Sequence, residues 1–290
     1  MPELLTIGYG YSVAPLASRL KGEGWIIHGT TRDSAKAGRM VDEGILPHIW
    51  DGESSLPEEA VKRADVIIVS VAPDAAGCPA ARALKQLQSK TVLIYLSSSG
   101  VYGDHDGAWI DEDTVCTPTS RRGRQRLLAE QQWQDMAMRD NARSHLCRLS
   151  GIYGPGRNAV ESLQGETRGA KAGLSQRIIK PGQVFNRIHR DDIAGGLYAL
   201  IMASGAPSIL NFADDEPSPP QDVITYAAGL LGIEPPPEVP FEEAELSPMG
   251  RSFYADNKRL RNDRLKALPG FTLTYPDYRS GLEAIIASQA

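Results

Sequence analysis

The sequence has few cysteines and no long apolar run. Three cysteines, Cys78, Cys116 and Cys147, stand among 290 residues, and none belongs to a C-x-x-C pair. This spacing argues against a zinc site and a disulfide framework, and it indicates a reducing compartment without a bound metal. No stretch approaches the roughly 20 apolar residues of a membrane-spanning helix. The N-terminus also lacks the basic and apolar regions of a secretory signal. We therefore expect a cytoplasmic protein with no membrane partner.

An excess of positive charge is also lacking, since the net charge is −5 at pH 7. This charge gives no electrostatic reason to expect a nucleic-acid partner. With 41% hydrophobic residues, a chain of this length can bury a large core. It fits either one large α/β unit or a domain with a smaller lobe.

A strand, a glycine turn and a helix are expected within the first thirty residues. The apolar run 4–7 is followed by a turn that contains Gly8, Gly10, Tyr11 and Ser12. Glycines let the backbone approach a ligand closely, and a helix start presents its N–H groups to a phosphate. A second apolar run at 25–32 completes a βαβ unit of the length that a dinucleotide site needs. The third glycine of the usual spacing is replaced by Val13, so the match is partial.

The end of the second predicted strand bears on which dinucleotide binds. An acidic residue at this place holds the ribose 2′-hydroxyl of NAD, whereas a nearby arginine accommodates the 2′-phosphate of NADP. Here the strand ends in Thr31 and Arg32, with no acid before Asp33. This pattern favours NADP, with Thr31 and Arg32 on the phosphate. Alternatively, Arg32 is a solvated residue that opens the next helix, with Asp33 or Ser34 as its cap.

Three more strands are expected at 45–50, 64–71 and 91–96, with a helix at 78–88 before the last of them. Near-continuous apolar strands are typical of a parallel sheet buried on both faces. Ligands of such sheets lie beyond the carboxyl ends of the strands, so Asp51 is a candidate for the adenine edge. An Asp-Gly pair is equally typical of a plain turn. Ala72 is a small residue past which a cofactor backbone could run.

Two later segments, with the glycine turn, carry a family resemblance. They read S-S-S-G-V-Y-G at 97–103 and R-L-S-G-I-Y-G-P-G at 148–156. Together these motifs resemble the extended short-chain dehydrogenase/reductase superfamily, in its NAD(P)-dependent epimerase/dehydratase group, from Leu4 to about Ala287. The resemblance implies an α/β fold, a Rossmann-type doubly wound parallel sheet with a smaller C-terminal substrate lobe. It also implies a small-molecule substrate and is compatible with a homodimer.

The expected division assigns residues 1–155 to the cofactor-binding domain, whose sheet is completed by about 182–213. Residues 156–181 and 214–290 then form the small substrate lobe. In the family, the turn that contains Tyr153 lies beside the nicotinamide, which makes Tyr153 a cofactor-binding candidate. The alternative for this segment is a plain Gly-Pro turn.

The family's catalytic pair, a tyrosine and a lysine four residues apart, is not found at its expected place. Counting back from Glu130 puts Arg126 at the lysine position and Arg122 at the tyrosine position. An arginine stays protonated and cannot act as the tyrosine does. We expect Arg126 to bind the nicotinamide ribose and Arg122 an anionic group of the substrate. The chain thus resembles the atypical branch of the superfamily.

Ser98 matches the family's serine that hydrogen-bonds the substrate oxygen. Tyr102 is the first candidate for the proton donor, because we expect its hydroxyl at the mouth of the cleft, where Arg122 and Arg126 would lower its pKa. Alternatively, Tyr102 packs structurally against the loop. His189 is the second candidate for proton transfer.

Asn186, Arg187 and His189 belong to a segment that, in the family, returns from the substrate lobe and often lines the substrate pocket. The acids at 191 and 192, which follow this segment, are also typical of a helix cap. The stretch 251–259 is a further place where pocket residues are expected.

Three functions remain open at this stage. The first is an NADP-dependent oxidoreductase that transfers hydride to or from a small carbonyl or alcohol. The second is a nucleotide-sugar epimerase or dehydratase, which is disfavoured because Ser99 and Gly100 stand where the family's dehydratases keep acidic residues. The third is a non-catalytic NADP-binding or sensor protein, since the cofactor motifs persist while the catalytic pair is lost.

Overall fold

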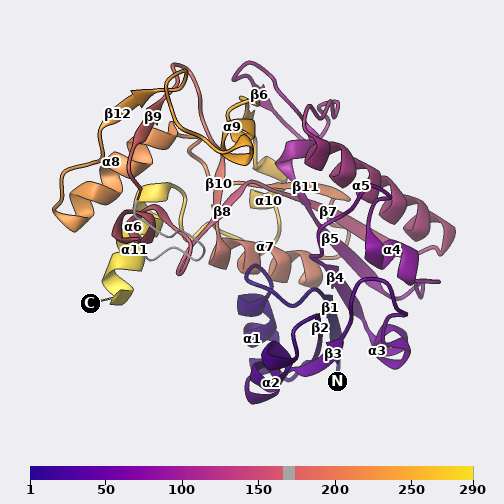
Figure 1. The fold of residues 1–290 in the computed structure, drawn as a ribbon. Helices are drawn as coiled ribbons and strands as arrows, with labels where there is room; N and C mark the ends of the chain where they lie inside the picture. Colours follow the sequence, from indigo (N-terminus) through magenta and orange to yellow (C-terminus); the bar gives the residue numbers. More distant parts are fainter. Residues whose placement is uncertain (166–173, 290) are drawn as a thin grey trace.

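A seven-stranded parallel sheet forms the centre of the computed structural model, which describes residues 1–165 and 174–289 (Figure 1). The strands run in the order β11-β7-β5-β4-β1-β2-β3. Their bounds are β1 (Glu3–Ile7), β2 (Ile26–Thr31), β3 (Leu46–Ile49), β4 (Val66–Val69), β5 (Val92–Ser98), β7 (Arg143–Leu149) and β11 (Ile209–Phe212). The order reverses at β1, and ligands of such sheets bind beyond the carboxyl ends of the strands at this point. The predicted fold class, a Rossmann-type α/β fold, is confirmed.

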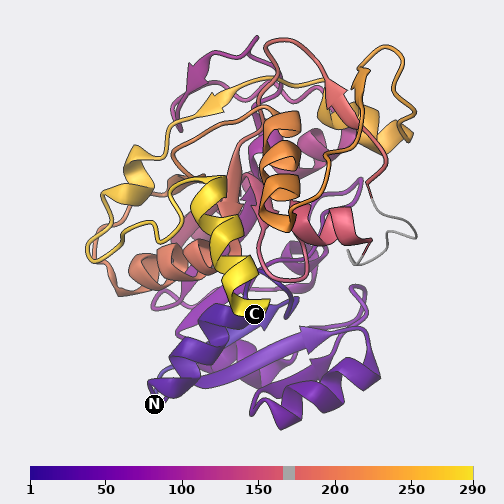
Figure 2. The ribbon, with the colours of Figure 1, turned by 90° about the vertical axis from the view of Figure 1, so that its left-hand side faces the viewer.

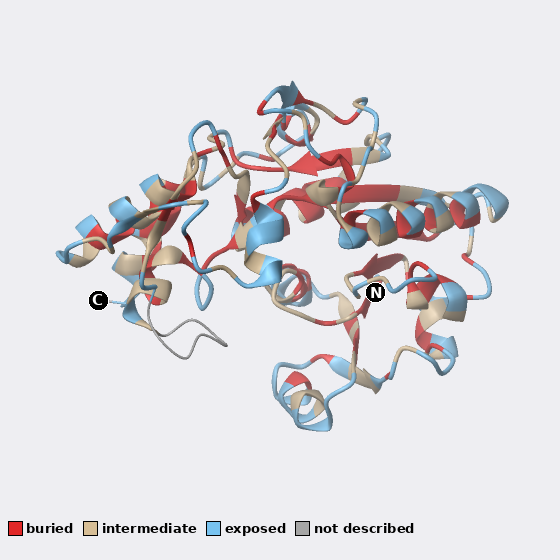
Figure 3. Ribbon diagram, turned by 45° about the horizontal axis from the view of Figure 1, so that its top comes forward, coloured by how far each residue is buried: buried red, intermediate tan, exposed pale blue. Residues whose placement is uncertain are grey.

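Helices cover both faces of the sheet, and the central strands β1, β4 and β5 are buried along all or nearly all of their length (Figure 3). One face packs against α1 (Ala14–Gly22), α2 (Ser34–Asp42) and α7 (Arg190–Met202). The other packs against α3 (Glu58–Arg63), α4 (Pro79–Ala83) and α5 (Arg121–Arg139). Side chains along β1 alternate between the two cores, with Leu4 in the first and Leu5 in the second.

The helix predicted at 78–88 is wrong in its second half, because α4 ends at Ala83. Leu84 has an extended backbone, with φ −83° and ψ 114°. Leu84 and Leu87 are both buried in the core under α5. The backbone N–H of Leu87 donates to the Asp140 carboxylate at 2.7 Å, so a side chain replaces the helical acceptor there. The apolar residues that suggested a helix therefore pack from an irregular segment.

A third hydrophobic cluster lies beside the sheet, where α6 (Ala159–Gln164), α8 (Pro220–Leu231) and α11 (Tyr278–Gln289) pack together (Figure 2). Three short strand pairs lie outside the central sheet. They are β8 (Gly151–Tyr153) with β10 (Arg187–His189), β9 (Arg177–Ile179) with β12 (Glu238–Pro240), and β6 (Trp109–Ile110) with β13 (Arg259–Leu260). The remaining elements are η1 (Ser99–Val101), α9 (Pro248–Phe253) and α10 (Asp263–Lys266). Residues 166–173 of the predicted lobe lie outside the described residues.

None of the helices in the described part of the chain has both the length and the apolar character needed to cross a bilayer. Within the same residues, no group of three or more histidine, cysteine, aspartate or glutamate side chains is arranged to hold a metal ion.

Candidate cofactor and substrate site

A cavity of about 770 Å³ lies at the carboxyl edge of the sheet, where the strand order reverses. The ends of β5 and β7 form its floor, and α5 and the stretch 252–258 contribute walls. Of the predicted site residues, seven line this cavity: Ser12, Ser98, Arg122, Arg126, Tyr153, Asn186 and Arg187. The predicted site residues, which come from segments far apart in the sequence, therefore meet at one cavity.

The glycine turn has the shape that a pyrophosphate requires. Gly8 has φ +92°, and a Cβ on it would lie 2.9 Å from the side chains of both Ser70 and Val71. A Cβ on Gly10 would meet nothing closer than 3.8 Å, so the turn is open on that side. No side chain caps the start of α1, which leaves this helix end suited to an anion. These residues fit a dinucleotide, and Gly8, Gly10 and Ser12 are the ones that would hold its phosphates.

Val13, at the position of the third glycine, does not prevent α1 from packing against the sheet. Its side chain is fully buried in the core between α1 and the sheet. Tyr11 reaches the opposite side, where its hydroxyl donates to the Pro155 carbonyl at 3.0 Å. The Arg190 guanidinium lies 4.9 Å from the centre of the Tyr11 ring. Tyr11 therefore links the glycine turn to the turn after β8.

Thr31 and Arg32, the residues predicted to bind the adenosine end of the cofactor, lie at the end of β2. Asp33 is the cap of α2, since its carboxylate accepts from the N–H groups of Ala35 and Lys36 at 2.9 and 3.1 Å. The cap named in the alternative interpretation is thus correct. Arg32 is exposed beside it. The Thr31 hydroxyl accepts from the Asp33 N–H at 3.2 Å.

Asp51 and Ala72 lie outside the cavity wall. The Asp51 carboxylate accepts three hydrogen bonds of 2.8 Å from Glu53 and Ser54, which lower its pKa to about 2. This is the Asp-Gly turn that the sequence allowed as an alternative, and it occupies one oxygen of the carboxylate. After β4, Ser70 lines the cavity in place of the exposed Ala72.

Arg126 lies against the end of β5. Its guanidinium donates to the Leu96 carbonyl at 2.8 Å and to the Tyr95 hydroxyl at 3.0 Å. The helix comes this close because of Gly123, where a Cβ would overlap the Gly100 carbonyl oxygen. Arg122 is exposed at the start of α5 and contacts the Met249 sulfur at 3.7 Å. Both arginines line the cavity.

Ser98 lies where the family resemblance places it, at the end of β5 in the cavity wall. Its hydroxyl oxygen accepts from the Gly100 N–H at 3.1 Å and caps η1. The hydroxyl hydrogen remains available to donate to an oxygen in the cavity.

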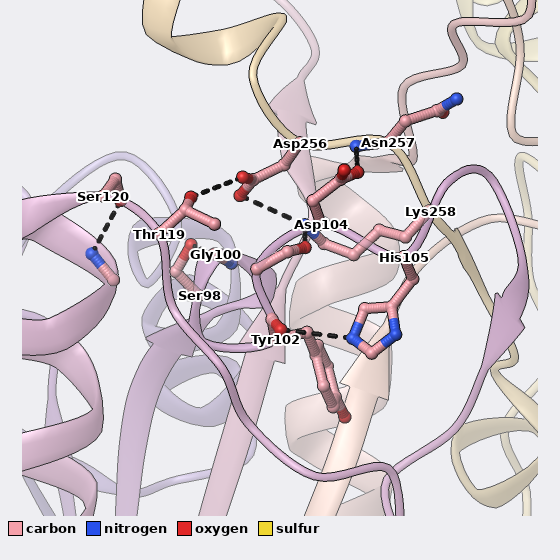
Figure 4. Close-up of polar contacts among 12 residues, drawn as sticks. Ser98, Gly100, Tyr102, Asp104, His105, Thr119, Ser120, Asp256, Asn257 and Lys258 are labelled. Carbon is pink, nitrogen blue, oxygen red and sulfur yellow. Dashed lines mark hydrogen bonds and ion pairs between the residues drawn. The ribbon is translucent and has the colours of Figure 1, made fainter.

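The prediction that Tyr102 lies at the mouth of the cleft is wrong. Tyr102 is fully buried, and its hydroxyl donates to Asn211 on β11 at 2.8 Å. Figure 4 shows its ring pointing away from Ser98 and Lys258. Burial raises the pKa of Tyr102 to about 12, and the nearby cation is Arg148, 4.7 Å from the ring centre, rather than Arg122 or Arg126. The Tyr102 ring packs in a buried apolar cluster around this loop. This agrees with the alternative interpretation, in which Tyr102 packs structurally against the loop.

His189 is also buried and does not line the cavity, which contradicts its candidate role in proton transfer and substrate contact. It packs between Tyr153 and Tyr275, at ring-centre distances of 5.1 and 4.0 Å. Its Nδ1 accepts from the Asp191 N–H at 3.2 Å, so His189 itself caps α7. Burial lowers the pKa of His189 to about 4. Tyr153 lines the cavity, but its hydroxyl donates to the Asp277 carbonyl at 3.2 Å.

Asn186 and Arg187 reach the wall but are bonded mainly to backbone. The Asn186 amide donates to the Lys258 carbonyl at 2.9 Å and accepts from the Leu260 N–H at 2.8 Å. The Arg187 guanidinium donates to the carbonyls of Phe185 and Ser218 at 3.0 and 3.2 Å. Arg187 is held in place by these bonds and lines the cavity.

The sequence analysis missed the individual roles of Asp256 and Lys258, although the stretch 251–259 was expected to reach the pocket. Both line the cavity, together with Ser252 and Phe253. The Asp256 carboxylate accepts from the Thr119 hydroxyl at 2.6 Å and lies 3.4 Å from the Lys258 amine. No sequence motif predicts this pair, because the pair is far from the β5 loop in the sequence and approaches it only in the folded chain.

Comparisons with known proteins agree with this architecture. The sequence model of the NAD dependent epimerase/dehydratase family matches residues 76–212. A functionally unknown conserved protein from Silicibacter pomeroyi DSS is 45% identical over 99% of both chains, with a TM-score of 0.89. A Methylobacillus flagellatus protein classed as an NAD-dependent epimerase/dehydratase is 28% identical over 99% of this chain and 98% of its own, with a TM-score of 0.71.

The 3-diazoavenalumate denitrifying reductase of a Streptomyces species is 28% identical over 147 residues, which are 47% of this chain and 44% of that protein. The chain thus matches less than half of the length of this curated relative. The UDP-glucuronic acid 4-epimerase of Bacillus cereus, solved with NAD, shares the fold at 16% identity and a TM-score of 0.73, over 99% of both chains. The glycine turn and the carboxyl-edge cavity agree with this likeness to the NAD dependent epimerase/dehydratase family, whose sequence model matches just under half of the chain.

Proposed function

We propose that the protein is an NADP-dependent oxidoreductase that transfers hydride between the cofactor and a small carbonyl or alcohol. The observation that carries the proposal is the meeting of the open glycine turn, Ser98 and Arg126 around one cavity. The nicotinamide supplies the hydride chemistry when it is bound. Arg126 would hold its ribose, because the guanidinium is fixed against the Leu96 carbonyl. The Ser98 hydroxyl would donate to the substrate oxygen.

The preference for NADP is supported by the adenosine end of the site. Arg32 is exposed at the end of β2, and Asp33 is committed to capping α2. A free acid at this place would bind the ribose of NAD, whereas an arginine pairs with a 2′-phosphate. Arg32→Glu should therefore weaken NADPH binding by tenfold or more and leave NADH binding unchanged or stronger. Equal affinities of the wild type for NADPH and NADH would contradict this assignment.

An anionic substrate is supported by the charge of the cavity. Its described wall has Asp256 as its acid, and this acid is paired with Lys258. The basic residues of that wall are Arg122, Arg126, Arg157, Arg187 and Lys258. With Arg126 assigned to the ribose, Arg122 and Arg187 remain for a carboxylate or phosphate of the substrate. The substrate lobe of the proposal is the part built on α6, α8 and α11.

A non-catalytic NADP-binding protein is the second candidate, and the absence of the family's tyrosine and lysine favours it. A nucleotide-sugar epimerase is the third, and it is favoured by the fold shared with the Bacillus cereus enzyme. The similarity to a reductase over 147 residues favours reduction instead.

One experiment separates the three candidates. Purified protein is titrated with NADPH and NADH by fluorescence, and NADPH oxidation is then followed with aldehydes, ketones and oxo acids. Binding with substrate-dependent oxidation supports the proposal. Tight binding without oxidation of NADPH by any carbonyl supports the sensor. Conversion of a nucleotide sugar without net change in the cofactor supports the epimerase.

A further inference from the structure

The amine of Lys258 is fixed in the cavity wall next to the loop that carries Ser98 (Figure 4). The residue is 6% exposed. Its Nζ donates to the Gly103 carbonyl at 2.6 Å and lies 3.4 Å from the Asp256 carboxylate. An ammonium group has three N–H donors, and these two partners use two of them. The third donor is left for a ligand in the cavity.

Several bonds hold this segment in position against the β5 loop. The Asn186 amide donates to the Lys258 carbonyl at 2.9 Å. The Asn257 N–H donates to the Asp104 carboxylate at 2.7 Å, and the Asn257 carbonyl accepts from the His105 N–H at 3.0 Å. The position of the amine is therefore set from both sides of the cavity, as a group that transfers a proton requires.

Other groups in the described wall are poorly suited to release a proton. Arginines stay protonated, and serine hydroxyls are very weak acids. The Tyr153 hydroxyl is turned to the Asp277 carbonyl, and burial raises its pKa. The Asp256 carboxylate already accepts from Thr119 and pairs with Lys258. Tyr102 and His189 do not line the wall.

We propose that Lys258 is the proton donor of this enzyme and takes the role of the tyrosine that Arg122 replaces. The inference rests on the proposed oxidoreductase function. In the reduction of a carbonyl, the chemistry supplied by the reduced nicotinamide is a hydride, which adds to the carbonyl carbon as the nicotinamide is oxidised. The C=O π electrons move to the oxygen, which takes a proton from Nζ. The alcohol leaves, and the neutral amine regains a proton from water.

The electrostatics of the site are consistent with this role. Burial lowers the pKa of Lys258, while the carboxylates of Asp256 and Asp104, which face the amine, oppose the decrease. The amine is thus a stronger acid than an exposed lysine, which favours the release of a proton to a substrate oxygen.

The test compares Lys258→Arg and Lys258→Met with the wild type in NADPH-dependent carbonyl reduction. Arginine keeps the charge and the bond to Gly103 but cannot release a proton, so both variants should lose about 100-fold or more in kcat/KM. NADPH affinity should change by less than about threefold. The matched control is Lys180→Met, because the Lys180 amine also donates to a backbone carbonyl, that of Tyr254, outside the cavity wall. This control should keep the wild-type rate.

The pH profile distinguishes a proton-donor role of Lys258 from a role that only holds the loop in place. The wild-type kcat/KM should fall at high pH as Lys258 loses its proton, and the residual rate of Lys258→Arg should not show this fall. A second readout needs no substrate: the 13Cε resonance of Lys258, assigned by its loss in Lys258→Arg, should titrate below the ordinary lysine value of about 10.4 and shift when NADP⁺ is added.

The outcomes distinguish the inference from the function on which it rests. If Lys258→Arg reduces carbonyls at the wild-type rate, the inference is overturned while the oxidoreductase function stands. If the wild type binds NADPH but reduces no carbonyl, the function fails. The NMR titration then decides whether the amine has the expected acidity and contact with the cofactor, and an ordinary or raised midpoint without a response to NADP⁺ overturns the inference.

Discussion

The guanidinium of Arg126 donates to the carbonyl of Leu96 at 2.8 Å, which ties α5 to the end of the strand that carries Ser98. The bond to the Tyr95 hydroxyl holds the same nitrogen from a second side. The guanidinium is thereby oriented before any ligand binds, which reduces the side-chain conformational entropy that is lost on binding.

Arg126→Met should therefore weaken NADPH binding by about tenfold, the effect of losing one hydrogen bond to a charged group. Arg126→Lys restores the family residue and should keep more of the affinity. Arg124→Met is the control, because Arg124 is exposed on the same helix and donates to the Thr119 carbonyl at 2.7 Å. Fluorescence titration measures all three. Wild-type affinity in Arg126→Met would remove this residue from the cofactor site.

Tyr102→Phe should leave turnover unchanged and lower the free energy of unfolding by about 1 kcal/mol. The hydroxyl is buried on Asn211, so its removal leaves the Asn211 carbonyl oxygen without this donor. Denaturant unfolding and steady-state kinetics measure the two effects. Ser98→Ala is the comparison and should lower kcat without a comparable loss of stability. A large loss of turnover in a folded Tyr102→Phe would restore the catalytic role that the structure contradicts.

Gly123→Ala should destabilise the protein by about 1–3 kcal/mol and weaken NADPH binding. A Cβ at this position would overlap the Gly100 carbonyl and lie 2.9 Å from the Pro118 Cβ, so α5 must move away from the Ser98 loop. Gly38→Ala in α2 is the matched control, since nothing lies within 4 Å of its Cβ position. That substitution should stabilise the protein by up to about 1 kcal/mol. Equal effects of the two changes would show that the contact at Gly100 is unimportant.

Glu130→Ala should lower the free energy of unfolding by about 3–5 kcal/mol, because it leaves the buried Arg148 without its partner. The pair is 2.8 Å apart, and the Ser97 hydroxyl also donates to Glu130. The double variant Glu130→Met with Arg148→Met should recover much of this loss, since apolar side chains of similar volume can replace a buried ion pair. Urea unfolding of Glu130→Met, of Arg148→Met and of the double variant measures the coupling. Additive losses would indicate that the two charges do not interact.

The parallel sheet, the glycine turn and the position of Ser98 were predictable because each depends on local patterns or on the order of motifs. The apolar runs mark buried strands wherever helices cover both faces. The orientation of Tyr102 was not predictable in this way. Tyr102 follows η1 by one residue, and its ring points into the core. There its hydroxyl bonds to Asn211, which lies 109 positions later in the sequence.

The contribution of Lys258 is another feature that pattern reading does not reach. Asn186, 72 positions earlier, brings the lysine to the loop after β5. Asn186, which was expected to contact substrate, lines the cavity and also holds the segment that contains Lys258. The positions of Arg122 and Arg126 in the cavity wall were predictable, because both residues lie on one helix at four-residue intervals before Glu130.

The stability of the fold should depend on pH through His189. Its folded-state pKa is lowered to about 4 by burial, against about 6.5 in the unfolded chain. The folded state therefore resists protonation, and the stabilisation is complete above pH 6.5. It is lost progressively as the pH falls from 6.5 to 4, by about 3 kcal/mol in all.

His189→Asn should remove this part of the acid sensitivity, because the amide oxygen can still accept from the Asp191 N–H but does not titrate in this range. Denaturant unfolding between pH 4 and 8 measures the slope, with His105→Asn as the control. His105 is not among the buried side chains, and its ring bonds to the Tyr102 carbonyl at 3.1 Å. The control should keep the wild-type slope. If His189→Asn loses stability between pH 6.5 and 4 as steeply as the wild type, other groups must carry the acid sensitivity.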